Sequence, residues 1–305
     1  MRIGIIINPV SGRAGRRPGT GARRSALART LLATRRIEAD VRLTRGPGHA
    51  AEIARGWLDR GYDRVIAWGG DGTVSEVARP LVGTHTSLGI VRSGSGDGFA
   101  RGLRIPGHPA RAMAVALSAR TRAIDVGRFG DRHFLNVVGI GFDGAVAHAS
   151  HVRLGRGVFG YITDGLARVW RYVAADYVLD LDGVRLSGPR FLVAFANGPQ
   201  YGNNVVLAPD ADPGDGTLDV LVVADGTPLQ QFWRARRLIV RRRHPARGLI
   251  RMRVRTARVS GDLLTCHLDG EPYETSGSVE VSLLPAALRV AVPAAQARGL
   301  RRART

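Results

Sequence analysis

Apolar residues in the first 120 positions fall into short runs that alternate with helical patterns. Glycine, proline or polar residues bound each run, which is typical of buried strands, and between the runs apolar residues recur every three or four positions. The expected strands are residues 3–7, 39–43, 65–68 and 88–91, and the expected helices are residues 25–34, 50–58, 74–81 and 109–117. This alternation predicts a parallel sheet that is covered by helices on both faces.

The pattern changes near residue 124, after which short strands dominate. The expected strands are residues 134–138, 177–181, 191–195, 217–223, 252–254, 265–268 and 279–284, with helices at residues 158–172 and 229–243. Turn residues separate these strands, so this part predicts an antiparallel sheet or sandwich. The chain therefore divides into an α/β domain at residues 1–123 and a β-sandwich domain at residues 124–289, and we expect residues 290–305 to return to the first domain.

The segment Gly69-Gly70-Asp71-Gly72-Thr73 joins an expected strand to an expected helix. Glycines let the backbone approach a phosphate closely, and a helix start offers unpaired N–H groups and a partial positive charge. Asp71 could also reach a metal or orient a hydroxyl. The segment predicts phosphate binding, and the alternative is a tight turn with no ligand.

Polar and glycine-rich segments also follow the other three expected strands of this domain. Ligands bind at the carboxyl ends of strands in an open parallel sheet, so four such segments at one edge predict a phosphate-lined crevice. The chain has no lysine, which excludes a Walker A loop, and no Gly-x-Gly-x-x-Gly follows the first strand. The three further segments are residues 8–12, 44–49 and 92–101.

The formal net charge is +20, and the chain has 45 arginines and no lysine. This charge favours an anionic partner, which is a nucleotide, a nucleic acid or an anionic membrane. Nucleic-acid-binding motifs are absent from the sequence, so we expect no nucleic acid partner. The single cysteine, Cys266, excludes an intramolecular disulfide, and no apolar run reaches the length of a membrane span. We expect a cytoplasmic protein that contacts the inner face of the cell membrane peripherally.

Five blocks, in this order, resemble the diacylglycerol kinase catalytic-domain family, and more narrowly the soluble bacterial lipid kinases related to sphingosine and ceramide kinases. The resemblance covers the chain from about Arg2 to Pro293. It implies a three-layer α/β nucleotide domain and an antiparallel β-sandwich, with ATP bound in a cleft between them and its γ-phosphate transferred to a lipid hydroxyl. The blocks are Asn8-Pro9-x-Ser11-Gly12, Gly69-Gly70-Asp71-Gly72-Thr73-x-x-Glu76, Gly94-Ser95-x-x-x-Phe99-Ala100-Arg101, Asp215-Gly216-x-Leu218-Asp219 and Asp269-Gly270-Glu271.

The resemblance also implies roles for single residues. Asp71 would contact the ATP phosphates and belong to the catalytic set. Asp269 would be the candidate general base, and Glu271, on the same turn, is the second candidate for the catalytic carboxylate. The Asp-Gly pair is equally a common hairpin turn, which stays the alternative for this block. The nucleotide-binding residues would be Asn8, Ser11, Gly12, Thr44, His49, Gly69, Gly70, Asp71, Gly72, Thr73, Ser75, Glu76, Gly94 and Ser95.

An acidic segment at residues 210–219 leads into an expected strand. Clustered oxygens with glycine turns suit Mg²⁺ or Ca²⁺, although the spacing is not that of an EF-hand. The resemblance implies a Mg²⁺ held by the Asp215 side chain and by main-chain oxygens at Asp212 and Thr217. The alternative is an Asx turn without metal.

Three positions depart from the family pattern. Ser75 stands where Asn is usual, Asp97 replaces an Asn, and Gly98 replaces an Asp. Asp97 brings a negative charge to a place where an amide would be neutral. These departures could alter nucleotide or metal preference or reduce activity, so an inactive relative is one alternative.

The expected helix at residues 229–243 is amphipathic, with apolar and arginine faces. It could rest on an anionic bilayer, or it could pack on the sandwich with a solvated basic face.

The main hypothesis is an ATP- and Mg²⁺-dependent kinase of diacylglycerol or a related lipid alcohol at an anionic membrane surface. The alternatives are a kinase for NAD or another small molecule and a basic nucleic-acid-binding protein, and a second copy of the chain is a further candidate partner.

Overall fold

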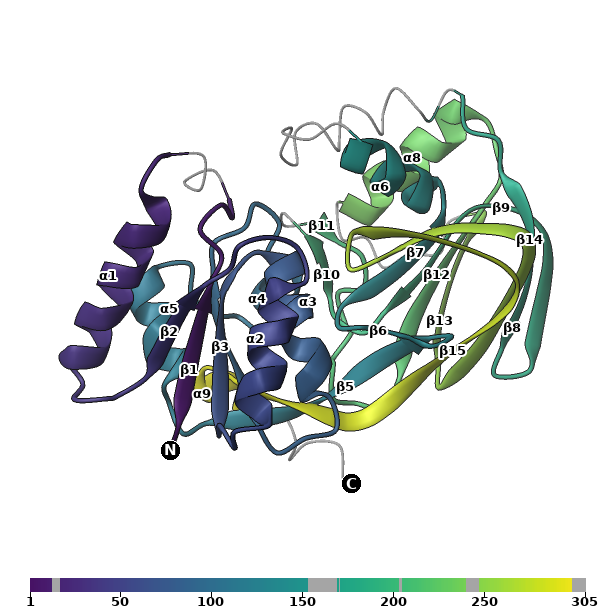
Figure 1. Cartoon of the computed structure of the whole chain (residues 1–305). Helices are drawn as coiled ribbons and strands as arrows, with labels where there is room; N and C mark the ends of the chain where they lie inside the picture. Colours follow the sequence, from purple (N-terminus) through teal and green to yellow (C-terminus); the bar gives the residue numbers. More distant parts are fainter. Residues whose placement is uncertain (13–16, 153–168, 170, 203–204, 240–246, 298–305) are drawn as a thin grey trace. The chain divides into compact units, whose positions relative to one another are not determined.

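The computed structural model describes residues 1–12, 17–152, 169, 171–202, 205–239 and 247–297, and these residues belong to two compact units (Figure 1). Unit 1 comprises Met1–Ile124 and the chain from Ala286 onward, and unit 2 comprises Asp125–Pro285. The chain passes from one unit to the other within two strands, β5 (Thr121–Phe129) and β15 (Glu271–Ala291).

Unit 1 is built on a parallel sheet in the order β2-β1-β3-β4, followed by the end of β15, where Val290 pairs with Leu88. The strands β1, β3 and β4 are almost entirely buried, which explains why each reads as an uninterrupted apolar run. The strands are β1 (Ile3–Ile7), β2 (Asp40–Leu43), β3 (Arg64–Gly69) and β4 (Ser87–Arg92).

Helices cover both faces of this sheet, with α2 and α3 packed on each other in front of it and α5 behind it in Figure 1. The approach of α2 is close: a Cβ on Gly4 of β1 would lie 2.2 Å from the Trp57 ring, so only glycine fits there. The parallel α/β part of the predicted fold class is therefore confirmed. The helices are α1 (Thr20–Ala33), α2 (His49–Leu58), α3 (Asp71–Ala78), the 3-10 turn η2 (Arg79–Leu81), α4 (Gly98–Gly102), α5 (Pro109–Ala116) and α9 (Ala294–Ala297).

Unit 2 is antiparallel, as predicted, and its strands follow the order β13-β12-β9-β7-β14-β15. Strand β8 pairs with both β9 and β14, on the same edges that β7 uses, so β8 and β7 follow one another between these two long strands. The strands are β6 (Arg132–Phe134), β7 (Val137–Gly141), β8 (Ala175–Leu181), β9 (Val184–Ala196), β10 (Gln200–Gly202), β11 (Val205–Val206), β12 (Leu218–Ala224), β13 (Leu249–Val254) and β14 (Thr256–Leu268).

Side chains of β9 alternate between two apolar clusters of unit 2. Val193 and Phe195 belong to the larger cluster, whereas Ala194 and Ala196 belong to the second. Helix α6 (Phe142–Val152) packs on β7, β14 and β9, and its Phe142 contacts the second cluster. Both faces of the middle of this sheet are therefore covered.

The structure corrects the sequence interpretation of unit 2 at two places. The strand expected at residues 134–138 is interrupted at Leu135 and Asn136, because the N–H groups there bind a side chain instead of a neighbouring strand. Helix α6 (Phe142–Val152) was not expected from the sequence. The helix expected at residues 158–172 lies almost wholly outside the described residues, as does the end of the one expected at residues 229–243, of which α8 (Pro228–Ile239) is described.

No helix in the described part of the chain combines the length and the apolar character that crossing a membrane would require.

Candidate active site

Three of the predicted strand-end loops of unit 1 are bonded to one another. The Asn8 side-chain amide donates to the Thr73 hydroxyl (2.9 Å), which ties the first loop to the glycine–aspartate loop. The hydroxyls of Ser11 and Ser93 share a hydrogen bond (2.7 Å), and the Ser93 N–H donates to the carbonyl of Gly69 (2.8 Å). The predicted gathering of these segments at one edge of the sheet is what the structure shows.

Glycines allow these loops to approach backbone to backbone. A Cβ on Gly12, which has a φ of 68°, would lie 1.9 Å from the Ser93 carbonyl oxygen, and a Cβ on Gly94 would lie 2.7 Å from the Cα of Gly70. Neither position has room for a side chain. The glycines are therefore required for the packing of the loops, whether or not they also meet a phosphate.

Arg24 of α1 holds the first loop and was not expected from the sequence. Its guanidinium donates to the carbonyl of Asn8 (2.6 Å) and to the hydroxyl and carbonyl of Ser11 (both 2.8 Å). Burial lowers the pKa of Arg24. A helical arginine among many others carries no sequence signal for this role.

Asp71 of the glycine–aspartate loop and Asp97 of the loop after β4 are close enough for their charges to interact. Asp71 accepts the Gly98 N–H (3.2 Å), and Asp97 accepts the Gly94 N–H (2.9 Å) with its backbone in the left-handed region, at a φ of 48°. Burial raises the pKa of Asp71, and burial together with the charge of Asp71 raises the pKa of Asp97 to about 6. Nearby Arg101 opposes both shifts. The charge that departs from the family pattern thus lies beside the central aspartate of the loop.

Two of the remaining predicted nucleotide residues, Glu76 and His49, have side chains bonded to the backbone of unit 1. Glu76 accepts the N–H of Ala50 at the start of α2 (3.2 Å), and Nδ1 of His49 accepts the N–H of Arg45 (2.9 Å). Thr44 and Ser75 are buried, whereas Gly72 and Ser95 are exposed. Gly72 and Ser95 are therefore the best placed of the set to meet a ligand from solvent.

Asp269 and Gly270 form the two-residue turn between β14 and β15. Both have positive φ, 53° and 92°, and Leu268 pairs with Glu271 across the turn, as in the hairpins that favour Asp-Gly. The hairpin alternative is therefore correct as a description of the backbone. It leaves the chemical roles of Asp269 and Glu271 open.

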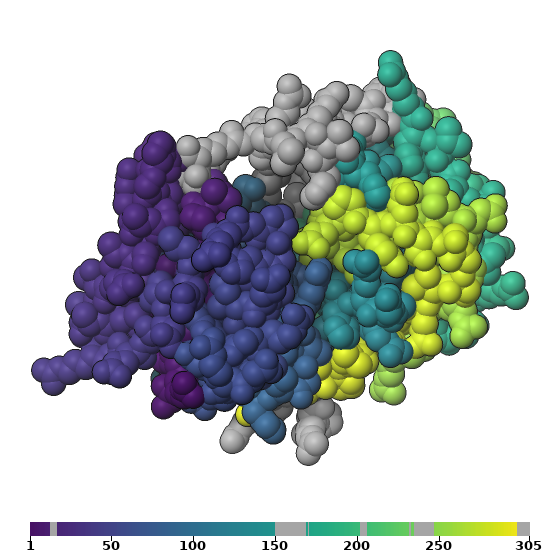
Figure 2. Space-filling view, viewed as in Figure 1, coloured from purple at the N-terminus to yellow at the C-terminus, as the bar shows by residue number. Residues whose placement is uncertain are grey.

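The Asp269 carboxylate binds the interruption between β6 and β7. One oxygen accepts the Leu135 N–H (2.7 Å), and the other accepts the N–H groups of Asn136 (2.9 Å) and Val137 (3.0 Å). Glu271, two residues later, is partly exposed at the first position of β15, the long strand that forms much of the yellow surface in Figure 2. Asp269 thus fixes the turn, and both carboxyl-bearing residues are partly exposed.

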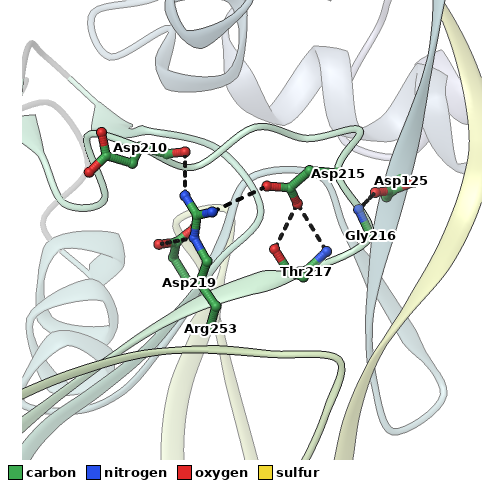
Figure 3. A network of polar contacts seen from close by, with 7 residues as sticks. All are labelled: Asp125, Asp210, Asp215, Gly216, Thr217, Asp219 and Arg253. Atoms are coloured by element: carbon green, nitrogen blue, oxygen red, sulfur yellow. Dashed lines mark hydrogen bonds and ion pairs between the residues drawn. The ribbon is translucent and has the colours of Figure 1, made fainter. Parts of the chain in front are cut away.

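The acidic segment is organised around Asp215 and Arg253 (Figure 3). One Asp215 oxygen accepts both the N–H (3.0 Å) and the hydroxyl (2.8 Å) of Thr217, and the other lies 4.0 Å from the Arg253 guanidinium. Arg253 also donates to the carbonyl of Asp210 (2.9 Å). The main-chain oxygen of Asp212 accepts the N–H groups of the two residues before Gly216, at 2.7 and 3.2 Å.

This segment has the hard oxygen donors that Mg²⁺ prefers, so the donor chemistry fits the predicted ion. An ion there would share Asp215 with Thr217 and Arg253. The Asx turn is present, and the magnesium site at Asp212, Asp215 and Thr217 stays a prediction. Among the described residues, no group of three or more histidine, cysteine or acidic side chains is arranged to hold a metal.

Asp97→Asn is expected to stabilise the protein at pH 8. A folded-state pKa of about 6, against 3.8 for the exposed group, means that ionised Asp97 costs free energy above about pH 6, and this cost fades as the pH falls through about 4. Asparagine keeps an oxygen for the Gly94 N–H without the charge, so the free energy of unfolding should rise by about 2 kcal/mol at pH 8. Thermal unfolding at pH 8 and pH 4.5 measures the gain, with the exposed Glu38→Gln as control. An unchanged Tm at pH 8, or a gain that is larger at pH 4.5, contradicts it.

Comparison with known proteins covers both units. Residues 2–129 match the family model of the diacylglycerol kinase catalytic domain, and residues 136–292 match the YegS C-terminal NAD kinase beta sandwich-like domain. A probable lipid kinase YegS-like from Chromohalobacter salexigens is 34% identical over 263 residues, which is 83% of each chain. A diacylglycerol kinase of Mycobacterium tuberculosis is 29% identical over 302 residues, covering 96% of this chain and 95% of the relative.

Solved structures show the same fold. A putative diacylglycerol kinase from Bacillus anthracis aligns with a TM-score of 0.77 at 22% identity, over 96% of this chain and 98% of its own. An NAD kinase from Archaeoglobus fulgidus in complex with ATP aligns with a TM-score of 0.56 at 14% identity, over 98% and 97%. With both family models matched in order along the chain, the protein belongs to the diacylglycerol kinase catalytic-domain family, among the YegS-like lipid kinases.

Proposed function

We propose that this protein transfers the γ-phosphate of ATP to the hydroxyl of diacylglycerol or a related lipid alcohol at the surface of an anionic membrane. The observation that carries the proposal is the bonded set of glycine-rich loops at the strand ends of unit 1, in a chain whose relatives are lipid kinases. Gly72 and Ser95 are exposed in two of these loops, where N–H and hydroxyl groups would meet phosphate oxygens. The bonds among the loops fix them before the nucleotide arrives, which lowers the cost of binding.

The geometry favours Glu271 over Asp269 as the base that takes the hydroxyl proton. Both Asp269 oxygens already accept backbone N–H groups, so proton uptake there would disrupt the support of the turn. Glu271 is partly exposed and is carried by that supported turn. A carboxylate on a fixed turn with access to solvent suits a group that must meet a substrate.

The proposed step is an in-line displacement. The lipid hydroxyl oxygen forms a bond to the γ-phosphorus while the bond from that phosphorus to the bridging oxygen breaks, the proton passes to the Glu271 carboxylate, and ADP leaves. Mg²⁺, if bound with the nucleotide, would neutralise charge on the phosphate oxygens. Asp71 would be the residue that helps to hold the ion, since Mg²⁺ in such sites binds through one or two carboxylates together with substrate phosphates.

Helix α8 provides an apolar surface for membrane contact. Leu229 and Trp233 lie one turn apart and are 62% and 52% exposed. Gln231 is buried, and both Gln231 (3.0 Å) and Arg234 (2.7 Å) donate to the carbonyl of Ala224, which fixes the opposite side of the helix to unit 2. A tryptophan and a leucine on an outward face of an arginine-rich chain suit the interface of an anionic bilayer.

Phosphate transfer tests the proposed reaction directly. Purified protein is incubated with γ-labelled ATP, Mg²⁺ and vesicles containing one lipid alcohol at a time, with NAD as a separate acceptor. Label is expected in diacylglycerol or a related lipid and not in NAD. Labelling of NAD alone would replace the lipid kinase by a small-molecule kinase, and no labelling of any acceptor would contradict both.

Paired variants separate the two carboxylates of the turn. Glu271→Gln should lower turnover at least ~100-fold, because an amide cannot take up the proton of the lipid hydroxyl. Asp269→Asn should lower the free energy of unfolding by about 1–3 kcal/mol, because an amide NH₂ would face a backbone N–H. Steady-state kinetics and denaturant unfolding measure the two effects. A Glu271→Gln enzyme with wild-type turnover would return the role of base to Asp269.

Replacing Leu229 and Trp233 together by serine is expected to weaken vesicle binding at least ~tenfold, because apolar area no longer enters the bilayer interface. Sedimentation with phosphatidylglycerol–phosphatidylcholine vesicles measures the change. Val184→Ser, at an exposed position on β9, is the matched control and should bind normally. Equal vesicle binding by the double variant and the control would contradict the proposed membrane contact of α8.

A further inference from the structure

A buried polar cluster of unit 2 lies directly beneath the Asp269–Gly270 turn. It consists of Asp143 at the start of α6, Tyr201 of β10 and His267 near the end of β14. His267 is fully buried and Asp143 is 7% exposed. Three polar groups from three elements meet in the interior, so each needs a partner, and the hydrogen bonds among them supply it.

The hydrogen bonds assign the proton on the imidazole of His267. Its Nδ1 accepts the N–H of Gly270 (3.1 Å), so Nδ1 carries no proton and the hydrogen lies on Nε2. Nε2 faces the Asp143 carboxylate (2.9 Å) and the Tyr201 hydroxyl, which itself donates to Asp143. Asp143 and Tyr201 therefore hold one edge of the ring so that the other edge presents a lone pair to the turn.

Two glycines leave the room that this cluster needs. Gly139 of β7 is the cross-strand partner of His267, and a Cβ there would lie 2.1 Å from the Asp143 carboxylate and 2.5 Å from Nε2 of His267. A Cβ on Gly144 of α6 would lie 2.3 Å from the carbonyl oxygen of Thr265. Glycine at position 139 leaves room beside β7 for the His267 ring and the Asp143 carboxylate, and glycine at position 144 lets α6 approach β14 closely.

The turn is held from a second direction as well. The Asp269 carboxylate binds the N–H groups of residues 135–137, and the Asn136 side chain donates to the carbonyl of Gln200 (2.6 Å), next to Tyr201. Two chains of hydrogen bonds thus start at adjacent turn residues and end at adjacent residues of β10. Because both sets of hydrogen bonds connect the turn to β10, they fix the direction in which the turn leaves the sheet.

We propose that His267, oriented by Asp143 and Tyr201, is a positioning residue that fixes Gly270 and thereby sets the direction of the Glu271 carboxylate. Its kinetic consequence rests on the proposed function, whereas its structural consequence, a protected Gly270 N–H, does not. The ring touches neither substrate nor nucleotide, because it is fully buried. Its effect should therefore appear in kcat and leave the KM for ATP unchanged.

Two conservative variants divide the contacts of the ring. Asparagine places an oxygen near the position of Nδ1 and can still accept the Gly270 N–H, whereas glutamine places its amide near Nε2 and keeps only the contact with Asp143. His267→Gln should lower kcat ~10- to 100-fold, since small misplacements of a reacting group have effects of this size. His267→Asn should stay within ~threefold of the wild type, and His85→Gln, at an exposed position in unit 1, serves as control.

Amide hydrogen exchange at Gly270 provides a readout that does not depend on activity. Exchange should be faster in His267→Gln than in the wild type and His267→Asn, with Tm values compared for all three. Equal Gly270 exchange in the two variants, or a kcat loss in His267→Asn as large as in His267→Gln, overturns the proposal. A wild type that phosphorylates no acceptor but shows the exchange pattern would refute the kinase function and leave the positioning contact intact.

Discussion

Backbone N–H groups that lose their ladder partners where a strand ends must find another acceptor, and in this protein carboxylates supply it. Asp269 accepts three such groups at the interruption between β6 and β7. Asp182 accepts two at the start of β14, Asp125 accepts the N–H of Gly216, and Glu76 serves the start of α2. Acidic side chains, scarce in so basic a chain, thus satisfy backbone amides at several element ends, and at Asp269 this ties the turn that carries the candidate chemistry to the neighbouring chain segment.

The parallel part of the fold is predictable from the sequence because its strands are buried on both faces. An uninterrupted apolar run of five residues that ends at Asn8-Pro9 indicates a buried strand, and β1 coincides with residues 3–7. Unit 2 is harder, since β14 and β15 extend well beyond the apolar stretches at residues 265–268 and 279–284 into partly exposed, polar sequence. There the hydrogen bonds between strands, not an apolar period, determine the length of the strand.

The candidate site divides in the same way. Glycine-rich segments are easy to recognise in a sequence, so the gathering of the loops that contain Asn8, Thr73 and Ser93 could be predicted. Arg24 and His267 were not, because each acts through partners far away in the chain and neither belongs to a local motif. Asp97 is intermediate: its departure from the family pattern was visible, but its raised pKa depends on the burial and the neighbouring Asp71 that only the fold provides.

The end of β15 completes unit 1, and this has a consequence for synthesis on the ribosome. Val290 pairs with Leu88 of β4, Ala287 accepts the N–H of Gly83 (2.7 Å), and Val292 donates to Arg120 (3.2 Å). The nascent chain must therefore make all of unit 2 before the last strand of the first unit exists, and until then β4 presents an open hydrogen-bonding edge. Unit 2, as one contiguous segment, can finish folding first, so the domain that starts the chain is the last to be completed.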